Sequence, residues 1–294
     1  MSFLDLYTSP ALTFAGTERG FDDAEYIVIG VPLDYTSSYR PGSRFAPLAI
    51  REASRNIEGF SFRTKGSISD LKIYDAGDLH VDADIEETLR RLELVTGEVL
   101  SKGKMPILIG GEHTLTLGST RSIKEDFAVL CFDAHLDLRD EYMKRKICHA
   151  TVMRRILEIK NLRKIVMIGT RAACREEIIY AEGHGIDFIS SLEIHRSSIE
   201  EISLRINKLL EGPDAVYLSI DMDVLDPAFA PAVQTPEPEG ISTHQLLEII
   251  SRIDLKGLVA FDVVEVAPQY DNGVTSAVAA KTIFEVLSRV SRFG

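Results

Sequence analysis

The chain has 294 residues, of which 45% are hydrophobic, and it carries a net charge of −12 at pH 7. The apolar content is ample for a sizeable core, and neither a run of about 18 apolar residues nor a signal peptide is found, so we expect a globular, cytoplasmic protein without a membrane partner. The acidic balance argues against a nucleic-acid partner, which would favour basic clusters, and is compatible with a cationic substrate.

Short β-rich runs alternate along the chain with longer segments of helical period. Strands are predicted at residues 26–31, 72–77, 106–110, 127–132, 164–169, 186–190, 215–220 and 257–266. Amphipathic helices are predicted at residues 46–57, 84–103, 114–123, 200–212, 242–253 and 275–290. This alternation indicates an α/β fold with three layers, in which helices cover both faces of a mostly parallel eight-stranded sheet. No linker or internal repeat interrupts the pattern, so we expect a single domain over residues 1–294.

Three of the predicted strands end in side chains suited to metal binding. The stretches are "ILIGGEHT", in which a flexible glycine pair precedes the histidine, "CFDAHLDLRD" and "LSIDMDVLDP". Alternate residues of a strand point the same way, and ligands of open α/β sheets bind beyond the carboxyl ends of the strands. The stretches together supply two imidazoles and four carboxylates: His113, Asp133, His135, Asp137, Asp221 and Asp223.

This donor set favours Mn²⁺-like ions over structural zinc, because it mixes nitrogen with hard oxygen ligands and contains no thiolate. Cys131, Cys148 and Cys174 form no CxxC pair and are expected to be reduced thiols. Two unit charges about 4 Å apart repel by about 4 kcal/mol at an effective dielectric of about 20. Two divalent ions would cancel the four negative charges. Either HxD or DxD alone is equally compatible with turn chemistry, but three such elements after three parallel strands favour a metal site.

Two further ionisable residues lie close to these motifs in the sequence. Glu265 lies within the β-branched run "AFDVVEVAP", where an unpaired carboxylate is costly to bury. The residues alone favour an internal salt bridge there over a cationic ligand. His149 begins a predicted helix and could be an acid–base group, although a capping or surface histidine is the simpler interpretation.

The motifs "GGEHT", "DAHLD" and "SIDMDVLDPAFAP" resemble the three signature motifs of the ureohydrolases, the arginase and agmatinase family of binuclear manganese enzymes. The segments "SYRPGSRFAPLAIREAS" and "VVEVAPQYDNGVTSAVAAK" are also similar to agmatinase segments, so the resemblance covers nearly the whole chain. It implies an arginase-like fold, two Mn²⁺ ions per subunit, a small cationic guanidino substrate and a homo-oligomer, either a trimer or a hexamer.

The resemblance also implies a role for each candidate residue. Four ligands would serve largely one metal or bridge the pair, namely His113, Asp133, Asp137 and Asp221. His135 and Asp223 would complete the other metal. Glu265 would bind the guanidinium group, which reverses the preference for a salt bridge. Asp137 would orient and deprotonate the attacking water, and His149 would be the substrate-contacting proton shuttle.

The preferred substrate is agmatine, which would give urea and putrescine, a step of polyamine biosynthesis. The loop "LRDEYMKRKIC" lacks the Asn- and Ser-rich residues with which arginases read the α-carboxylate and α-amino groups of arginine. The chain departs from the family pattern at Glu112, Ala150 and residues 232–234, none of which is among the six ligands.

Three alternatives to this function stay open at the level of sequence. The first is a ureohydrolase of guanidinobutyrate, arginine or formiminoglutamate. The second is a metal-binding protein without catalysis, which would need neither Glu265 nor His149. The third is an amide or acetyl hydrolase on the related deacetylase fold, whose sites usually hold one zinc and would not need six ligands.

Overall fold

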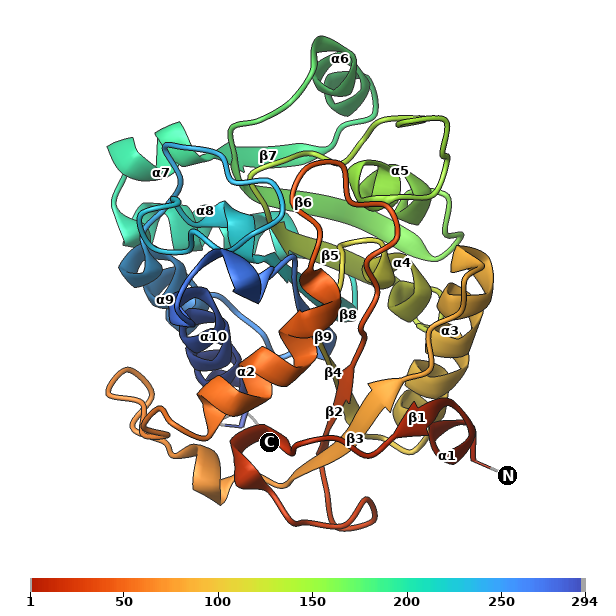
Figure 1. Cartoon of the computed structure of the whole chain (residues 1–294). Coiled ribbons are helices and arrows are strands. Elements are labelled where there is room, and N and C mark those ends of the chain that lie inside the picture. The colour runs from red at the N-terminus through yellow and green to blue at the C-terminus, as the bar shows by residue number, and fades with distance from the viewer. Residues whose placement is uncertain (1, 292–294) are drawn as a thin grey trace.

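A computed structural model describes residues 2–291, and within them nine strands form one sheet at the centre of the molecule (Figure 1). The strands are β1 (Thr8–Ser9), β2 (Tyr26–Gly30), β3 (Ile73–Leu79), β4 (Met105–Ile109), β5 (Phe127–Phe132), β6 (Leu162–Thr170), β7 (Asp187–Ser190), β8 (Ala215–Asp221) and β9 (Leu258–Val264). All eight predicted strands are present. The ninth, β1, was not predicted because two residues are too few to show an alternating pattern.

The order of the strands places the candidate ligands together. It runs β1-β3-β2-β4-β9-β8-β5-β6-β7, with β1 antiparallel to β3 and every other neighbouring pair parallel. The strands β4, β9, β8 and β5 are therefore consecutive neighbours in the middle of the sheet. Because they are parallel, their carboxyl ends meet at one edge.

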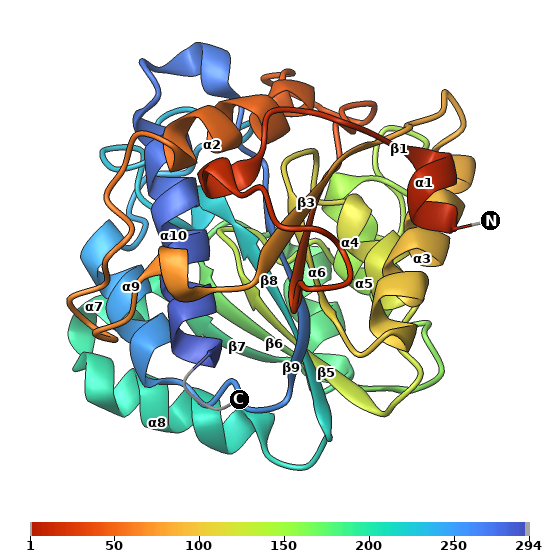
Figure 2. The same cartoon turned by 90° about the horizontal axis from the view of Figure 1, so that it is seen from below.

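Helices cover both faces of the sheet, which gives the predicted three layers (Figures 1 and 2). One face carries α2 (Ala46–Ser54), α7 (Ser191–Arg196), α8 (Ile199–Leu210), α9 (Thr243–Arg252) and α10 (Val274–Val290). The other face carries α1 (Phe3–Tyr7), α3 (Ile85–Ser101), α4 (Leu115–Thr120), α5 (Val152–Ile156) and α6 (Arg175–Gly183). The six predicted helices are confirmed. Helices α1, α6 and α7 were not predicted because they bury too few residues to show an apolar stripe: Leu4 in α1, Glu177 and Ala181 in α6, and Ser191 and Ile194 in α7.

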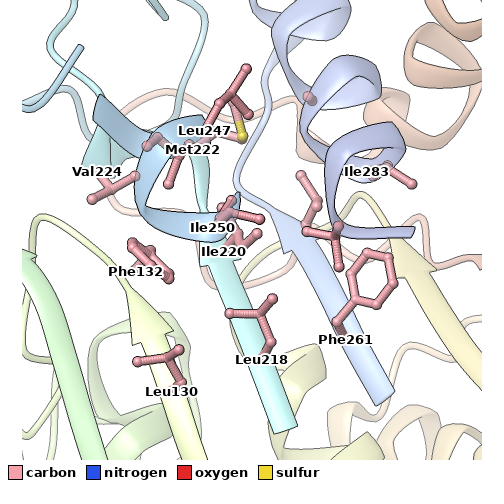
Figure 3. Packing of buried hydrophobic residues seen from close by; sticks show 14 of the residues in the cluster. Leu130, Phe132, Leu218, Ile220, Met222, Val224, Leu247, Ile250, Phe261 and Ile283 are labelled. Carbon is pink, nitrogen blue, oxygen red and sulfur yellow. The ribbon is translucent and has the colours of Figure 1, made fainter. Parts of the chain in front are cut away.

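The central strands are held rigidly because both of their faces are buried. Every residue of β5 and β8 is buried, as expected for parallel strands between two helical layers. Figure 3 shows Leu130 of β5 and Leu218 of β8 in the same cluster as Ile250 of α9 and Ile283 of α10. The ends of these strands are therefore fixed points on which a site can be built.

None of the helices within residues 2–291 is both long enough and apolar enough to cross a bilayer. The expectation of a single domain over residues 1–294 stays a prediction, and its two ends, residue 1 and residues 292–294, lie outside the described residues.

A buried ion pair joins α2 to the sheet. The Arg51 guanidinium is fully buried, and its Nε and Nη2 atoms each lie 2.8 Å from one carboxylate oxygen of Asp75 on β3. The Arg51 Nη2 atom also donates to the Gly77 carbonyl, at 2.9 Å. A bidentate pair of this kind is strong because both groups are charged and the two hydrogen bonds are parallel.

We predict that Arg51→Met lowers the free energy of unfolding by about 3–5 kcal/mol, because it leaves the Asp75 carboxylate buried without its cation. Urea denaturation measures the loss. The control is Arg163→Met, which breaks an ion pair with Asp126 in which both side chains are half exposed. Equal effects of the two substitutions would contradict the prediction.

Candidate metal centre

The six predicted ligands follow three of the four central strands. His113 lies beyond β4, after Gly110 and Gly111, whose φ angles are 87° and 73°. A Cβ atom on Gly111 would overlap the carbonyl oxygen of Val31, so the predicted need for glycine in this turn is confirmed. The other five follow β5 or close β8: Asp133, His135, Asp137, Asp221 and Asp223.

One group of candidate ligands surrounds the Nδ1 atom of His113. This atom lies 3.1 Å from Asp133 Oδ2, 3.1 Å from Asp137 Oδ2 and 3.5 Å from Asp221 Oδ2. The Nδ1 atom and Asp133 Oδ2 are buried and have no hydrogen-bond partner, although they face each other. A buried imidazole nitrogen and a buried carboxylate oxygen that face each other in this way are suited to bind one divalent cation together.

A second group shares Asp133 with the first. His135 Nδ1 lies 3.0 Å from Asp223 Oδ2 and 3.5 Å from Asp133 Oδ1. The two oxygens of the Asp133 carboxylate therefore face different histidines. The structure thus brings all six side chains together as two adjoining candidate sites that meet at Asp133.

The hydrogen bonding at Nε2, the other ring nitrogen of His113, explains why its Nδ1 atom carries a lone pair. The Ser219 hydroxyl donates to Asp262 Oδ1 at 2.6 Å, so it can accept a hydrogen bond from His113 Nε2, which lies 2.9 Å away. The hydrogen of the neutral ring is then on Nε2, and Nδ1 is free to bind a cation. Cys131 Sγ also lies near Nε2, at 3.8 Å, but burial raises the pKa of this thiol to about 12 and keeps it protonated.

The carboxylates of the cluster oppose one another's ionisation. Burial, and next the charge of Asp133, raise the pKa of Asp137 to about 7. Burial, followed by the charges of Asp223 and Asp133, raises the pKa of Asp221 well above its ordinary value. Full ionisation of this cluster is therefore costly on its own, and bound cations would relieve the cost.

Two of the predicted catalytic residues have a strained backbone. Asp137 and Glu265 have φ angles of 52° and 66°, in the left-handed region that non-glycine residues rarely occupy. Such conformations cost about 1–3 kcal/mol each and cluster at active sites. These backbone conformations direct both side chains into one cavity, which His149 also lines.

The Glu265 side chain is buried at the end of β9, and its two carboxylate oxygens differ. Its Oε1 atom accepts a hydrogen bond from the His113 N–H at 2.5 Å, whereas Oε2 is buried and has no partner. Across residues 2–291 no side chain donates a hydrogen bond to the Glu265 carboxylate. The internal salt bridge that the residues alone favoured is therefore wrong. Burial raises the pKa of Glu265 well above its ordinary value, which a cation beside Oε2 would counteract.

His149 is neither a surface residue nor a side-chain helix cap. It begins a 3₁₀ turn, His149–Thr151, that leads into α5, as predicted, and its half-buried ring lines the cavity. Burial lowers the pKa of His149 to about 4. The ring is therefore neutral at pH 7.

The cavity has a volume of about 670 Å³ and includes residues that sequence reasoning missed. Ser38 and Tyr39 reach it from the loop after β2, and Arg171 and Glu237 from the loops after β6 and β8. Ser38 and Tyr39 lie in a segment that resembles agmatinases, which could have marked them. Single polar residues in the other loops leave no pattern in the sequence.

The departures from the family pattern have different consequences. Ala232, Val233 and Gln234 are buried but do not line the cavity. The Gln234 side chain accepts a hydrogen bond from Ser37 Oγ at 2.6 Å and donates to Ser43, so it holds the loop after β2 in place. Ala150 lines the cavity beside His149.

Comparison with known proteins gives consistent matches. The model of the arginase family matches residues 24–288. The chain is 36% identical over 288 residues to the agmatinase of Pyrococcus horikoshii, which covers 94% of this chain and 99% of that one. It is 36% identical over 300 residues to the N(1)-aminopropylagmatine ureohydrolase of Thermococcus kodakarensis, which covers 100% of both. The crystal structure of agmatine ureohydrolase of Thermoplasma volcanium superimposes with a TM-score of 0.89 at 36% identity, over 97% of this chain and 96% of that one.

We predict that Asp133→Ala abolishes binding of both divalent ions, because Asp133 faces both groups, whereas Asp223→Ala mainly removes one. The readouts are Mn²⁺ content after dialysis and the rise in Tm on adding Mn²⁺. Asp126→Ala, at the exposed opposite end of β5, is the control. Retention of two ions by Asp133→Ala would refute the shared site.

Proposed function

The chain belongs to the arginase family and is a ureohydrolase of a guanidino compound, and from this premise we propose that it hydrolyses agmatine to putrescine and urea with two Mn²⁺ ions. The six clustered residues would hold the ions as two groups that share Asp133. When bound, the ions would supply Lewis-acid chemistry that lowers the pKa of the attacking water, so that it can react at neutral pH.

The observation that carries the proposal is the unpartnered Oε2 atom of Glu265. It is a buried carboxylate oxygen without a hydrogen bond, on a residue that lines the same cavity as the metal cluster. The Oε2 atom has no hydrogen-bond donor beside it in the protein. A guanidinium group would supply planar N–H donors together with a positive charge. Glu265 would thereby hold the guanidinium carbon beside the attacking water.

The proton of the attacking water has a path through this chain's residues. Asp137 would accept it as the oxygen–carbon bond forms. His149 or Asp137 would then donate a proton to the leaving nitrogen as the carbon–nitrogen bond breaks. The second proton of the water stays on the hydroxyl group bound to carbon until the C=O bond of urea forms, and it then passes to the released amine. Both protons of the water thus end on the amine, and urea and putrescine leave as neutral and cationic products.

The outer part of the cavity favours a substrate whose far end is a cation. Arg171 donates to backbone carbonyls, including those of Asp223 and Glu237, so it is not free to bind a substrate carboxylate. Arg139 lies 3.8 Å from the Glu177 carboxylate and stacks over the ring of Tyr142.

The half-exposed Glu237 carboxylate, by contrast, is available to a substrate, because its one ion-pair contact within residues 2–291 is the distant one with the His135 ring, whose Nε2 atom lies 3.9 Å away. An ammonium group at the far end of agmatine would meet this charge. N1-aminopropylagmatine is a second candidate, because a cavity of about 670 Å³ leaves room for a longer amine. The trimer or hexamer implied by the resemblance stays a prediction.

We predict that Glu265→Gln lowers kcat/KM for agmatine about 10- to 100-fold, because a hydrogen bond to a charged group contributes ~1.5–3 kcal/mol. Mn²⁺ content is expected to stay close to that of the unmodified protein, since Glu265 contacts the backbone of His113 and not its ring. Steady-state urea release and metal analysis measure the two quantities. An unchanged kcat/KM would remove this role for Glu265.

Urea release should be compared across agmatine, N1-aminopropylagmatine, guanidinobutyrate, arginine and formiminoglutamate. We expect kcat/KM for agmatine to exceed that for guanidinobutyrate at least about tenfold, because the latter ends in a carboxylate. Glu237→Gln should reduce this preference by raising KM for agmatine alone. A preference for guanidinobutyrate would refute agmatine as the substrate, and no urea from any compound would refute the catalytic proposal.

A further inference from the structure

The Glu112 carboxylate is buried next to the metal cluster, yet it points away from it. Its Oε2 atom accepts hydrogen bonds from the backbone N–H groups of Tyr35 and Thr36, at 2.8 and 2.7 Å. Its Oε1 atom accepts from the hydroxyls of Thr36 and Thr114, both at 2.8 Å. Two donors therefore face each oxygen, and the four together match the acceptor sites of a carboxylate.

The hydrogen-bonding capacity of the Thr36 hydroxyl is filled in the same way. A hydroxyl has one hydrogen and two lone pairs. Its hydrogen goes to Glu112, so both lone pairs must accept. One accepts from the backbone N–H of His149, at 3.1 Å. The other faces His149 Nδ1, also at 3.1 Å, which must therefore carry a hydrogen.

The other ring nitrogen of His149, Nε2, faces a hydrogen-bond donor. His149 Nε2 lies 3.3 Å from the Ser38 hydroxyl, and both residues line the cavity. With hydrogen on Nδ1, the Nε2 atom of the neutral ring is an acceptor and matches this hydroxyl. With hydrogen on Nε2, two lone pairs would face each other between Nδ1 and Thr36.

We propose that Glu112 and Thr36 are positioning residues that hold neutral His149 in the Nδ1–H tautomer, so that Nε2 is the atom that exchanges protons in the cavity. Only the proton exchange rests on the proposed function, since the tautomer follows from the hydrogen bonds alone. Tyr142 supports the ring orientation, because its ring packs edge-to-face against His149 with 5.9 Å between centroids.

The loop that carries Thr36 and Ser38 is itself anchored. Ser37 Oγ donates to the buried Gln234 side chain at 2.6 Å, and Asp34 accepts from the Gly42 N–H, also at 2.6 Å. The Tyr35 carbonyl accepts from Arg145 Nη1 at 2.6 Å. The Thr36 hydroxyl is therefore presented by a loop tied down on both sides of it.

The direct test is the tautomer of His149 in the full-length protein, read from ¹H–¹⁵N long-range spectra after ¹⁵N-histidine labelling. Zn²⁺ replaces Mn²⁺ in the sample because paramagnetic Mn²⁺ broadens nearby signals, and the signals of His149 are assigned by their loss in His149→Asn. We expect a protonated Nδ1 and an unprotonated Nε2. A protonated Nε2 in the unsubstituted protein would overturn the proposal without any substitution at Thr36.

Substitution of Thr36 tests whether its hydroxyl determines the tautomer of His149. Thr36→Val keeps the shape and removes the hydroxyl, so the Nε2–H tautomer should gain population, whereas Thr36→Ser should restore Nδ1–H. Thr36→Val should also lower kcat about tenfold or more, while KM for agmatine and Mn²⁺ content change less than about twofold. An unchanged tautomer in Thr36→Val would overturn the proposal.

A double variant distinguishes the positioning of His149 by Thr36 from a general structural effect of the Thr36 substitution. In the His149→Asn background, Thr36→Val should cause no further loss of kcat, because Thr36 acts through His149. A further tenfold loss would show that Thr36 acts by another route. If the protein releases no urea from any guanidino compound, the proposed function fails, while the spectra still decide the tautomer.

Discussion

The mutual repulsion of carboxylates at one edge of the sheet is the constraint on which the rest of the structure depends. Asp133, Asp137, Asp221 and Asp223 are brought together because β8 and β5 are parallel neighbours whose carboxyl ends coincide. Such a cluster is unfavourable in a dry interior unless cations balance it. The buried strands therefore do more than fill a core, because they hold these charges at a separation that side chains alone would not keep.

The same constraint accounts for the strain around the cluster. Asp137 and Glu265 occupy left-handed backbone conformations that their side chains disfavour; Glu265 directly follows β9, and Asp137 lies in the loop after β5. The Glu265 N–H donates to the Gly111 carbonyl, and the Glu265 carboxylate accepts from the His113 N–H, so the ends of β4 and β9 are bonded to each other in both directions. The core stabilises a local geometry that would be lost in a looser fold.

Much of this arrangement could be predicted from the sequence because it depends on strong periodic signals. The strands were found from continuous apolar runs, five of the six ligand candidates from alternating ionisable residues at the ends of two strands, and His113 from the glycine pair that precedes it. The elements β1 and α7 could not be found this way, since β1 has only two residues and α7 buries only Ser191 and Ile194. Nor could the positive φ of Glu265 or the unpaired state of its Oε2 atom, because both depend on contacts with segments more than 100 residues away.

The roles of the Ser219 and Thr36 hydroxyls could not be predicted from the sequence either. The two hydroxyls act in the same way at two places in the structure. Each donates its hydrogen to a buried carboxylate, Asp262 or Glu112, and each is thereby left as an acceptor toward an imidazole. Ser219 faces Nε2 of His113 and so frees Nδ1 for the metal cluster. Thr36 faces Nδ1 of His149 and so frees Nε2 for the cavity. Two buried carboxylates that are not among the proposed ligands or catalytic groups thus decide which atom of each histidine can take part in the chemistry.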